Sequence, residues 1–141
     1  MKQSSVLAVL MAVGTAGSVW AADTVVHFGM VGIVGQTARL NVVNTAIGNP
    51  NESPCLVELT FFDSEGTQLT RKEQRLLGFG KAASVDYGDP NLLERSEIRA
   101  SVRKFDNPAT KVNECGDVIA TVEVFDNDTK RTAVLYTDPD Q

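Results

Sequence analysis

The stretch from Cys55 to Leu69 constrains the fold most, because a strand, a turn and the start of a returning strand follow one another within it. Apolar residues occupy alternate positions of its first half, as on the buried face of a strand, and Glu58 and Thr60 lie between them. The turn at 63–66 begins with Asp and ends with Gly, which suits a tight antiparallel connection. The stretch therefore predicts a β-hairpin with one buried face. The apolar positions are Cys55, Val57, Leu59 and Phe61.

The same period of two residues recurs along the chain, with turn residues between the repeats. The segment 67–77 carries several charges and is either an edge strand protected by them or partly a loop; the sequence leaves both open. Since almost every predicted element is a strand, we expect an all-β fold. Besides 55–62, the predicted strands are 24–28, 38–44, 83–87, 97–105, 118–126 and 132–136.

The N-terminus has the three parts of a secretory signal peptide: a basic start at Lys2, an apolar run and a small-residue end. Cleavage after Ala21 is favoured, because cleavage after Ala22 would place the bulky Trp20 at position −3. We therefore expect a signal peptide at 1–21 and a single β-sandwich domain at 22–141. The apolar run is shorter than the ~20 residues that span a bilayer, so no membrane insertion is expected after cleavage.

Charge and cysteine content limit the partners of the exported chain. The sequence has 13 basic and 18 acidic residues, a formal net charge of −5, which argues against nucleic acid or an anionic membrane as a partner. Two cysteines in an exported chain predict one disulfide, Cys55–Cys115, and a secreted or periplasmic location.

Three runs carry a resemblance to a known class of domain. Each is an alternating strand beside a glycine turn: Gly-Gln-Thr-Ala-Arg-Leu-Asn-Val-Val-Asn at 35–44, Leu-Val-Glu-Leu-Thr-Phe-Phe-Asp-Ser-Glu-Gly at 56–66, and Gly-Lys-Ala-Ala-Ser-Val-Asp at 80–86. Together they resemble the small secreted immunoglobulin-like or fibronectin III-like domains of bacteria. The resemblance implies an immunoglobulin-like antiparallel β-sandwich of about seven or eight strands with one disulfide. The tryptophan of antibody domains is missing, so antigen-receptor behaviour does not carry over.

The resemblance assigns 38–44, 55–62, 97–105 and 118–126 to strands B, C, F and G of such a sandwich. Both cysteines then lie at one end, and 118–126 lies beside 97–105, two strand spacings or roughly 10 Å from 55–62. Because a disulfide spans less than ~7 Å between Cα atoms, residues near the cysteines must lean together. If 118–126 were strand F instead, Cys115 would start at the far end and the bond could not form.

Catalysis has little support in the sequence. His27 is the single histidine and lies near the mature N-terminus, so no Ser-His or Cys-His relay is expected, and the cysteines are expected to be bonded rather than nucleophilic. We predict that the protein is not an enzyme and needs no cofactor.

Calcium is the chemical alternative. Turns containing Asp63 and Glu65, and Asp126 and Asp128, would lie at the end opposite the disulfide and could supply oxygen ligands of a calcium-dependent surface or adhesion domain. No Asp-x-Asp-x-Asp-Gly loop is present, and hairpin turn chemistry explains the same residues.

Binding through loops or strand edges is the function that the sequence favours. The loops 45–54 and 106–114 would form a tethered platform beside the disulfide. The segments 67–77 and 132–136 would offer edges for strand addition by a peptide or protein. We therefore expect an exported, non-catalytic module that binds a protein or peptide, or has a structural role in the cell envelope; the oligomeric state stays open.

Overall fold

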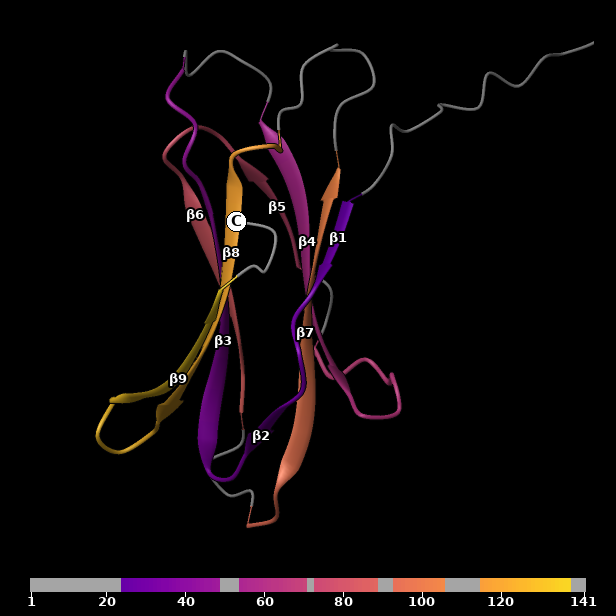
Figure 1. Ribbon diagram of the computed structural model, residues 1–141, viewed down its shortest axis with the longest axis vertical. Coiled ribbons are helices and arrows are strands. Elements are labelled where there is room, and N and C mark those ends of the chain that lie inside the picture. Colours follow the sequence, from indigo (N-terminus) through magenta and orange to yellow (C-terminus); the bar gives the residue numbers. More distant parts are fainter. Residues whose placement is uncertain (1–23, 49–53, 71–72, 89–92, 106–114, 138–141) are drawn as a thin grey trace, which may run out of the picture.

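A computed structural model describes residues 24–48, 54–70, 73–88, 93–105 and 115–137. They form nine strands in two antiparallel sheets that pack face to face as a sandwich (Figure 1). The predicted signal peptide and its cleavage positions, Ala21 and Ala22, lie outside the described residues. The all-β sandwich expected from the strand pattern is confirmed.

Sheet A has the strand order β1-β7-β4-β5, and β2 also pairs with β7. β1 and β2 lie end to end along the same side of β7, with a break between them at 28–30. This break accounts for nine strands where about seven or eight were predicted. The bounds are β1 Thr24–His27, β2 Val31–Ile33, β4 Cys55–Asp63, β5 Glu73–Leu77 and β7 Ser96–Phe105.

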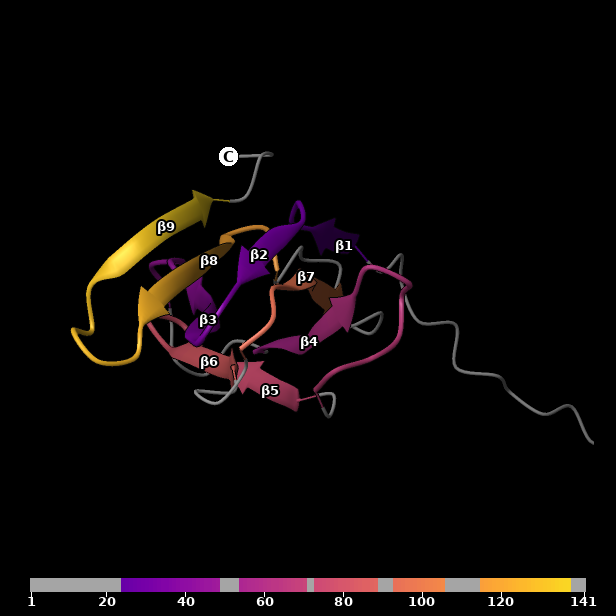
Figure 2. The same cartoon turned by 90° about the horizontal axis from the view of Figure 1, so that it is seen from below.

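Sheet B has the strand order β6-β3-β8-β9. A register shift between Val124 and Phe125 marks a bulge where β8 pairs with β9. Viewed from below, β9 lies at the outer edge of the sandwich (Figure 2). The bounds are β3 Gln36–Asn44, β6 Ala82–Tyr87, β8 Val118–Asp126 and β9 Thr132–Thr137.

The core lies between the two sheets and consists of the alternate residues that the period-2 pattern predicts. β3 and β8 bury every second residue and leave the others half-buried on the outer face of sheet B. Phe61 is fully buried, and its ring centroid lies 6.0 Å from that of Tyr87 on the facing sheet. The largest fully buried aliphatic side chains of the core are Ile33, Leu40, Leu59 and Ile98.

The segment 67–77 combines both of its predicted forms. The hairpin closes as expected, because the backbone N–H of Leu69 donates to the carbonyl of Phe61 and Gln68 forms an isolated bridge with Phe62. The hydroxyl of Thr70 accepts the backbone N–H of Phe61, and Glu73–Leu77 pairs with the first half of β4 as the edge strand β5. Gly66, at φ +87°, occupies the left-handed region that a glycine adopts without strain.

The central pairings agree with the immunoglobulin pattern, but the prediction for 118–126 was wrong. β3 pairs with β6, and β4 with β7, as strands B with E and C with F do. β8, however, pairs along its whole length with β3 in sheet B, and β1 and β2 take the place beside β7. Alternation states which residues of a strand face inward, but it does not state which strand lies next to it.

Candidate functional site

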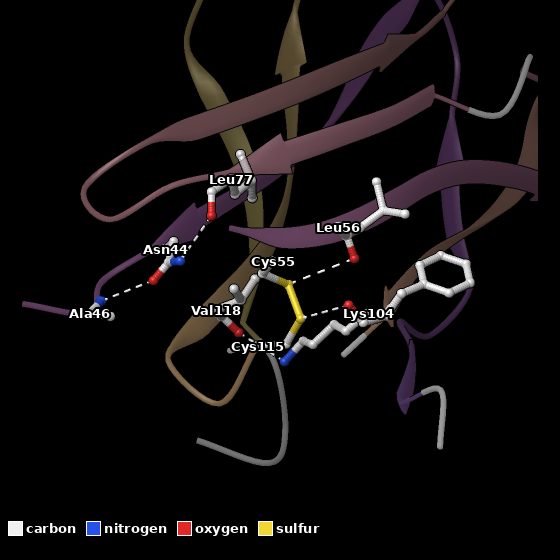
Figure 3. The surroundings of a disulfide bond; sticks show 9 residues. Asn44, Ala46, Cys55, Leu56, Leu77, Lys104, Cys115 and Val118 are labelled. Carbon is white, nitrogen blue, oxygen red and sulfur yellow. Dashed lines mark hydrogen bonds between the residues drawn. A yellow bond between two sulfur atoms is a disulfide. The ribbon is translucent and has the colours of Figure 1, made fainter. Parts of the chain in front are cut away.

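The disulfide between Cys55 and Cys115 is confirmed, with 5.1 Å between the two Cα atoms. Because β8 belongs to sheet B, the bond joins the two sheets rather than two strands of one sheet. Cys55 opens β4, and Cys115 lies three residues before β8 (Figure 3). Both half-cystines are buried. A disulfide is consistent with an oxidising location outside the cytoplasm.

Two polar side chains join the sheets beside the disulfide. Asn44, which is 1% exposed, donates from Nδ2 to the carbonyl of Leu77 and accepts from the backbone N–H of Ala46. Lys104 takes an inward position of β7 and donates from Nζ to the carbonyl of Val118 at 2.8 Å. Figure 3 shows both contacts around the sulfur atoms. The disulfide and these two hydrogen bonds therefore hold the two sheets together at this end of the sandwich.

Most of the predicted loop platform falls outside the described residues. The loop 106–114 is outside them entirely, and so is 49–53 of the loop 45–54. The described start of the first loop is anchored, because Thr45 donates from both its backbone N–H and its hydroxyl to the carbonyl of Asp117. Ile47 is fully exposed. Binding through these loops stays a prediction.

The acidic turns use their carboxylates to hold their own backbone. Oδ1 of Asp63 accepts the backbone N–H groups of Glu65 and Thr67 at 2.9 and 2.7 Å. Oδ1 of Asp126 likewise accepts the N–H of Thr129 at 2.6 Å. These bonds, led by the one from Thr67 in the first turn and the one from Thr129 in the second, lower the pKa of both carboxyls.

The calcium candidates lie in two separate turns. Asp63 and Glu65 belong to the turn after β4 in sheet A, and Asp126 and Asp128 to the turn after β8 in sheet B. Figure 1 shows these turns on opposite sides of the sandwich, the first at the right and the second at the left. Among the described residues no group of three or more His, Cys, Asp or Glu side chains could hold a metal ion. The geometry gives the carboxylates of Asp63 and Asp126 a role in stabilising their turns.

In the part of the chain that the structure describes, the two sheets have four edges, and three of them are blunted. The β1–β2 edge is interrupted at 28–30, and β5 carries the exposed charge of Arg75. β6 packs against β4 and β5 of the facing sheet and carries Asp86, which is bound by Arg39 through two bonds of 2.7 Å. Interruption, charge and covering are the usual means of protecting an edge.

Within the described residues, the remaining edge, β9, has none of these protections on its outer side. In the described part of sheet B it pairs with β8 alone, and its sequence, Thr-Ala-Val-Leu-Tyr-Thr, contains no charged residue. Ala133 and Thr137 are exposed, and Tyr136 is 38% exposed. β9 is therefore the strand most open to pairing with another chain.

The structure brings His27 to a place that sequence reasoning missed. His27 lies directly opposite Ser101 on the outer face of sheet A, and Thr60 lies on the other side of Ser101. No hydrogen bond joins the side chains of His27 and Ser101, both of which are described. Only the pairing of β1 with β7 shows this proximity, since 74 positions separate the two residues in the sequence. The absence of catalysis stays a prediction.

Comparison with known proteins adds no family to this description. No family model matches the chain, and neither a curated protein nor a solved structure matches it. Within the described residues, no helix is long and apolar enough to cross a membrane. The fold and its covalent bond define the class: an all-β, disulfide-linked, two-sheet sandwich.

Proposed function

We propose that this protein is an exported, non-catalytic module of the periplasm or the extracellular space that binds an extended segment of a partner protein by strand addition to β9. The observation that carries the proposal is the uncharged outer edge of β9, which pairs with no described strand other than β8, whereas the other described edges are blunted. In strand addition the main-chain hydrogen bonds of an open edge supply affinity, and side chains on alternate faces supply selectivity.

Rigidity of the sandwich supports this function. β9 is held by β8, which in turn pairs with β3 along its whole length at the centre of sheet B. The disulfide and the Lys104 bond attach the start of β8 to sheet A. A partner strand would therefore meet an edge that is already ordered, which reduces the conformational entropy lost on binding.

The test uses charges placed on the open edge. Protein purified from the exported fraction is used as bait for cell-envelope proteins, in parallel with the variant Ala133→Lys/Thr137→Lys. Lysines on an edge oppose pairing, so the variant should bind any specific partner about tenfold more weakly or worse. Ser84→Lys, at an exposed position of the opposite edge strand β6, is the matched control and should bind like the wild type.

Hydrogen exchange then locates the contact. Amides of β9 that point away from β8 should exchange rapidly in the free protein and become protected in the complex. Recovery of no specific partner, or of one that the β9 variant and the control bind equally well, would contradict the proposal.

A further inference from the structure

The outer face of sheet A contains a pair of polar residues that are almost fully covered. Thr60 on β4 and Ser101 on β7 are opposite each other on this face, yet they are only 3% and 7% exposed. The rows on either side consist of larger residues, Phe62 opposite Arg99 and Glu58 opposite Arg103. The two small hydroxyl residues therefore lie between larger side chains on this face.

Arg99, in the row next to Ser101, has one hydrogen-bond donor that is not satisfied. Its guanidinium carbon lies 5.6 Å from the centroid of the Phe62 ring, a cation–π contact. Its Nε is buried and has no hydrogen-bond partner. Within the described residues no carboxylate lies within ion-pairing distance of Arg99. A buried donor without an acceptor is destabilising in the free protein, so an acceptor that reached it would recover that loss on binding.

Arg39 on the outer face of sheet B shows what Arg99 lacks. Arg39 donates from Nε and Nη2 to the two carboxylate oxygens of Asp86, at 2.7 Å each, while its guanidinium carbon lies 5.1 Å from the centroid of the Phe125 ring. Arg99 has the same kind of aromatic contact without the carboxylate. By analogy with Arg39, a planar acceptor with two oxygens would complete the contacts of Arg99.

Further donors lie in the row beside Arg99. The hydroxyls of Thr60 and Ser101 can each donate one hydrogen bond, and the exposed imidazole of His27 lies next to Ser101 on β1. A guanidinium, two hydroxyls and an imidazole are thus presented on one face from three adjacent strands.

From this geometry we infer a binding site for the carboxylate of an exogenous ligand, with Arg99 as the principal donor and Thr60, Ser101 and His27 around it. A single carboxylate fits better than a polyanion, because the chain has a net charge of −5 and would repel a ligand with many negative charges. The site is on sheet A and does not involve β9, so it is independent of strand addition.

N-acetylglycine, which presents one carboxylate beside an amide, is the probe. It is titrated into ¹⁵N-labelled protein while the Arg99 Nε–H and the backbone amide of Ser101 are followed by NMR. Both resonances should shift and saturate at millimolar concentrations of the probe. Arg99→Gln, followed at Ser101, should weaken binding about tenfold or more, as expected for loss of a hydrogen bond from a charged group.

Arg39→Gln is the matched control, because it removes an arginine whose acceptor is already present, and it should leave binding unchanged. The backbone spectrum of each variant reports whether it is folded, and Ser101→Ala gives a second, smaller loss if Arg99→Gln is not. Failure of the shifts to saturate at tens of millimolar probe, or equal binding by Arg99→Gln, would overturn the site. Tighter binding of inorganic phosphate than of N-acetylglycine would overturn its assignment to a carboxylate.

Discussion

Nζ of Lys104 lies 2.8 Å from the carbonyl oxygen of Val118, so a lysine at an inward position of sheet A is bonded to the backbone of sheet B. The side chain is 9% exposed and follows Ile98, Ala100 and Val102 on the buried face of β7. Replacing it with methionine preserves most of the apolar stem but leaves the Val118 carbonyl without this donor.

We expect Lys104→Met to lower the free energy of unfolding by about 1–3 kcal/mol, the usual cost of leaving a buried acceptor unsatisfied. Urea denaturation measures the change. Lys81→Met, at an exposed position, is the control and should change stability by less than about 0.5 kcal/mol. A Lys104→Met variant as stable as the control would show that the inter-sheet bond contributes little.

The disulfide should make a larger contribution. Cys55 and Cys115 are 60 positions apart, and closing a loop of that length stabilises the fold by about 4 kcal/mol in the chain-entropy model. Cys55→Ala/Cys115→Ala should lose about this amount in chemical denaturation. Reductant should destabilise the wild type and leave the double variant unchanged; a wild type indifferent to reductant would contradict the prediction.

The turns that contain Asp63 and Asp126 should make the free energy of unfolding depend on pH in the acidic range. Hydrogen bonds within the turns lower the folded-state pKa of Asp63 and Asp126 below the ordinary value of 3.8. A lowered folded pKa adds stability at pH values above the unfolded pKa, and this stability is lost as the pH falls through the folded pKa.

Unfolding free energy should therefore fall below about pH 4, and it should fall less steeply in Asp63→Asn/Asp126→Asn. Urea denaturation at a series of pH values between neutral and strongly acidic measures the slope. Glu65→Gln, in the same turn as Asp63 but holding the turn only through its backbone N–H, should keep the wild-type slope. Equal slopes for all three proteins would count against this role of the aspartates.

Directly after β6, the backbone of Gly88 lies close to the backbone of Gln36 and Thr37. A Cβ added at Gly88 would lie 2.5 Å from the carbonyl oxygen of Gln36 and 2.8 Å from the Cα of Thr37. Gly88→Ala should cost about 1–3 kcal/mol, because backbone atoms rather than a flexible side chain must move. Gly29→Ala, where a Cβ meets nothing within 4 Å, should be nearly neutral in the same thermal or urea unfolding experiment. Equal stability of the two variants would refute the close approach.

Local chemistry was sufficient to predict the elements. Alternation of Cys55, Val57, Leu59 and Phe61 specifies a buried strand face. The turn from Asp63 to Gly66 forms because the Asp63 carboxylate accepts backbone N–H groups of the turn and Gly66 adopts the left-handed conformation. The disulfide was predicted because two cysteines in an exported chain most simply form one bond. The pairing proved right although the strand neighbours assumed for it were wrong.

The candidate surfaces depend on pairing between distant strands. The exposure of β9 as an edge, the position of His27 opposite Ser101 and the lack of an acceptor for Arg99 all follow from which strands are neighbours. β3 and β7 both have an alternating apolar face. The sequence of a third strand therefore does not show which of the two it pairs with.

The amino-acid sequence by itself determined that this protein is a disulfide-linked sandwich of strands, since the period of side chains, the turn residues and the cysteines act over a few positions or through one covalent bond. Only the tertiary structure decided that β8 joins β3 and that Cys55–Cys115 therefore joins two sheets. The physical reason is that each strand buries only one face in the core. Which strands become neighbours therefore depends on how all of these faces pack together.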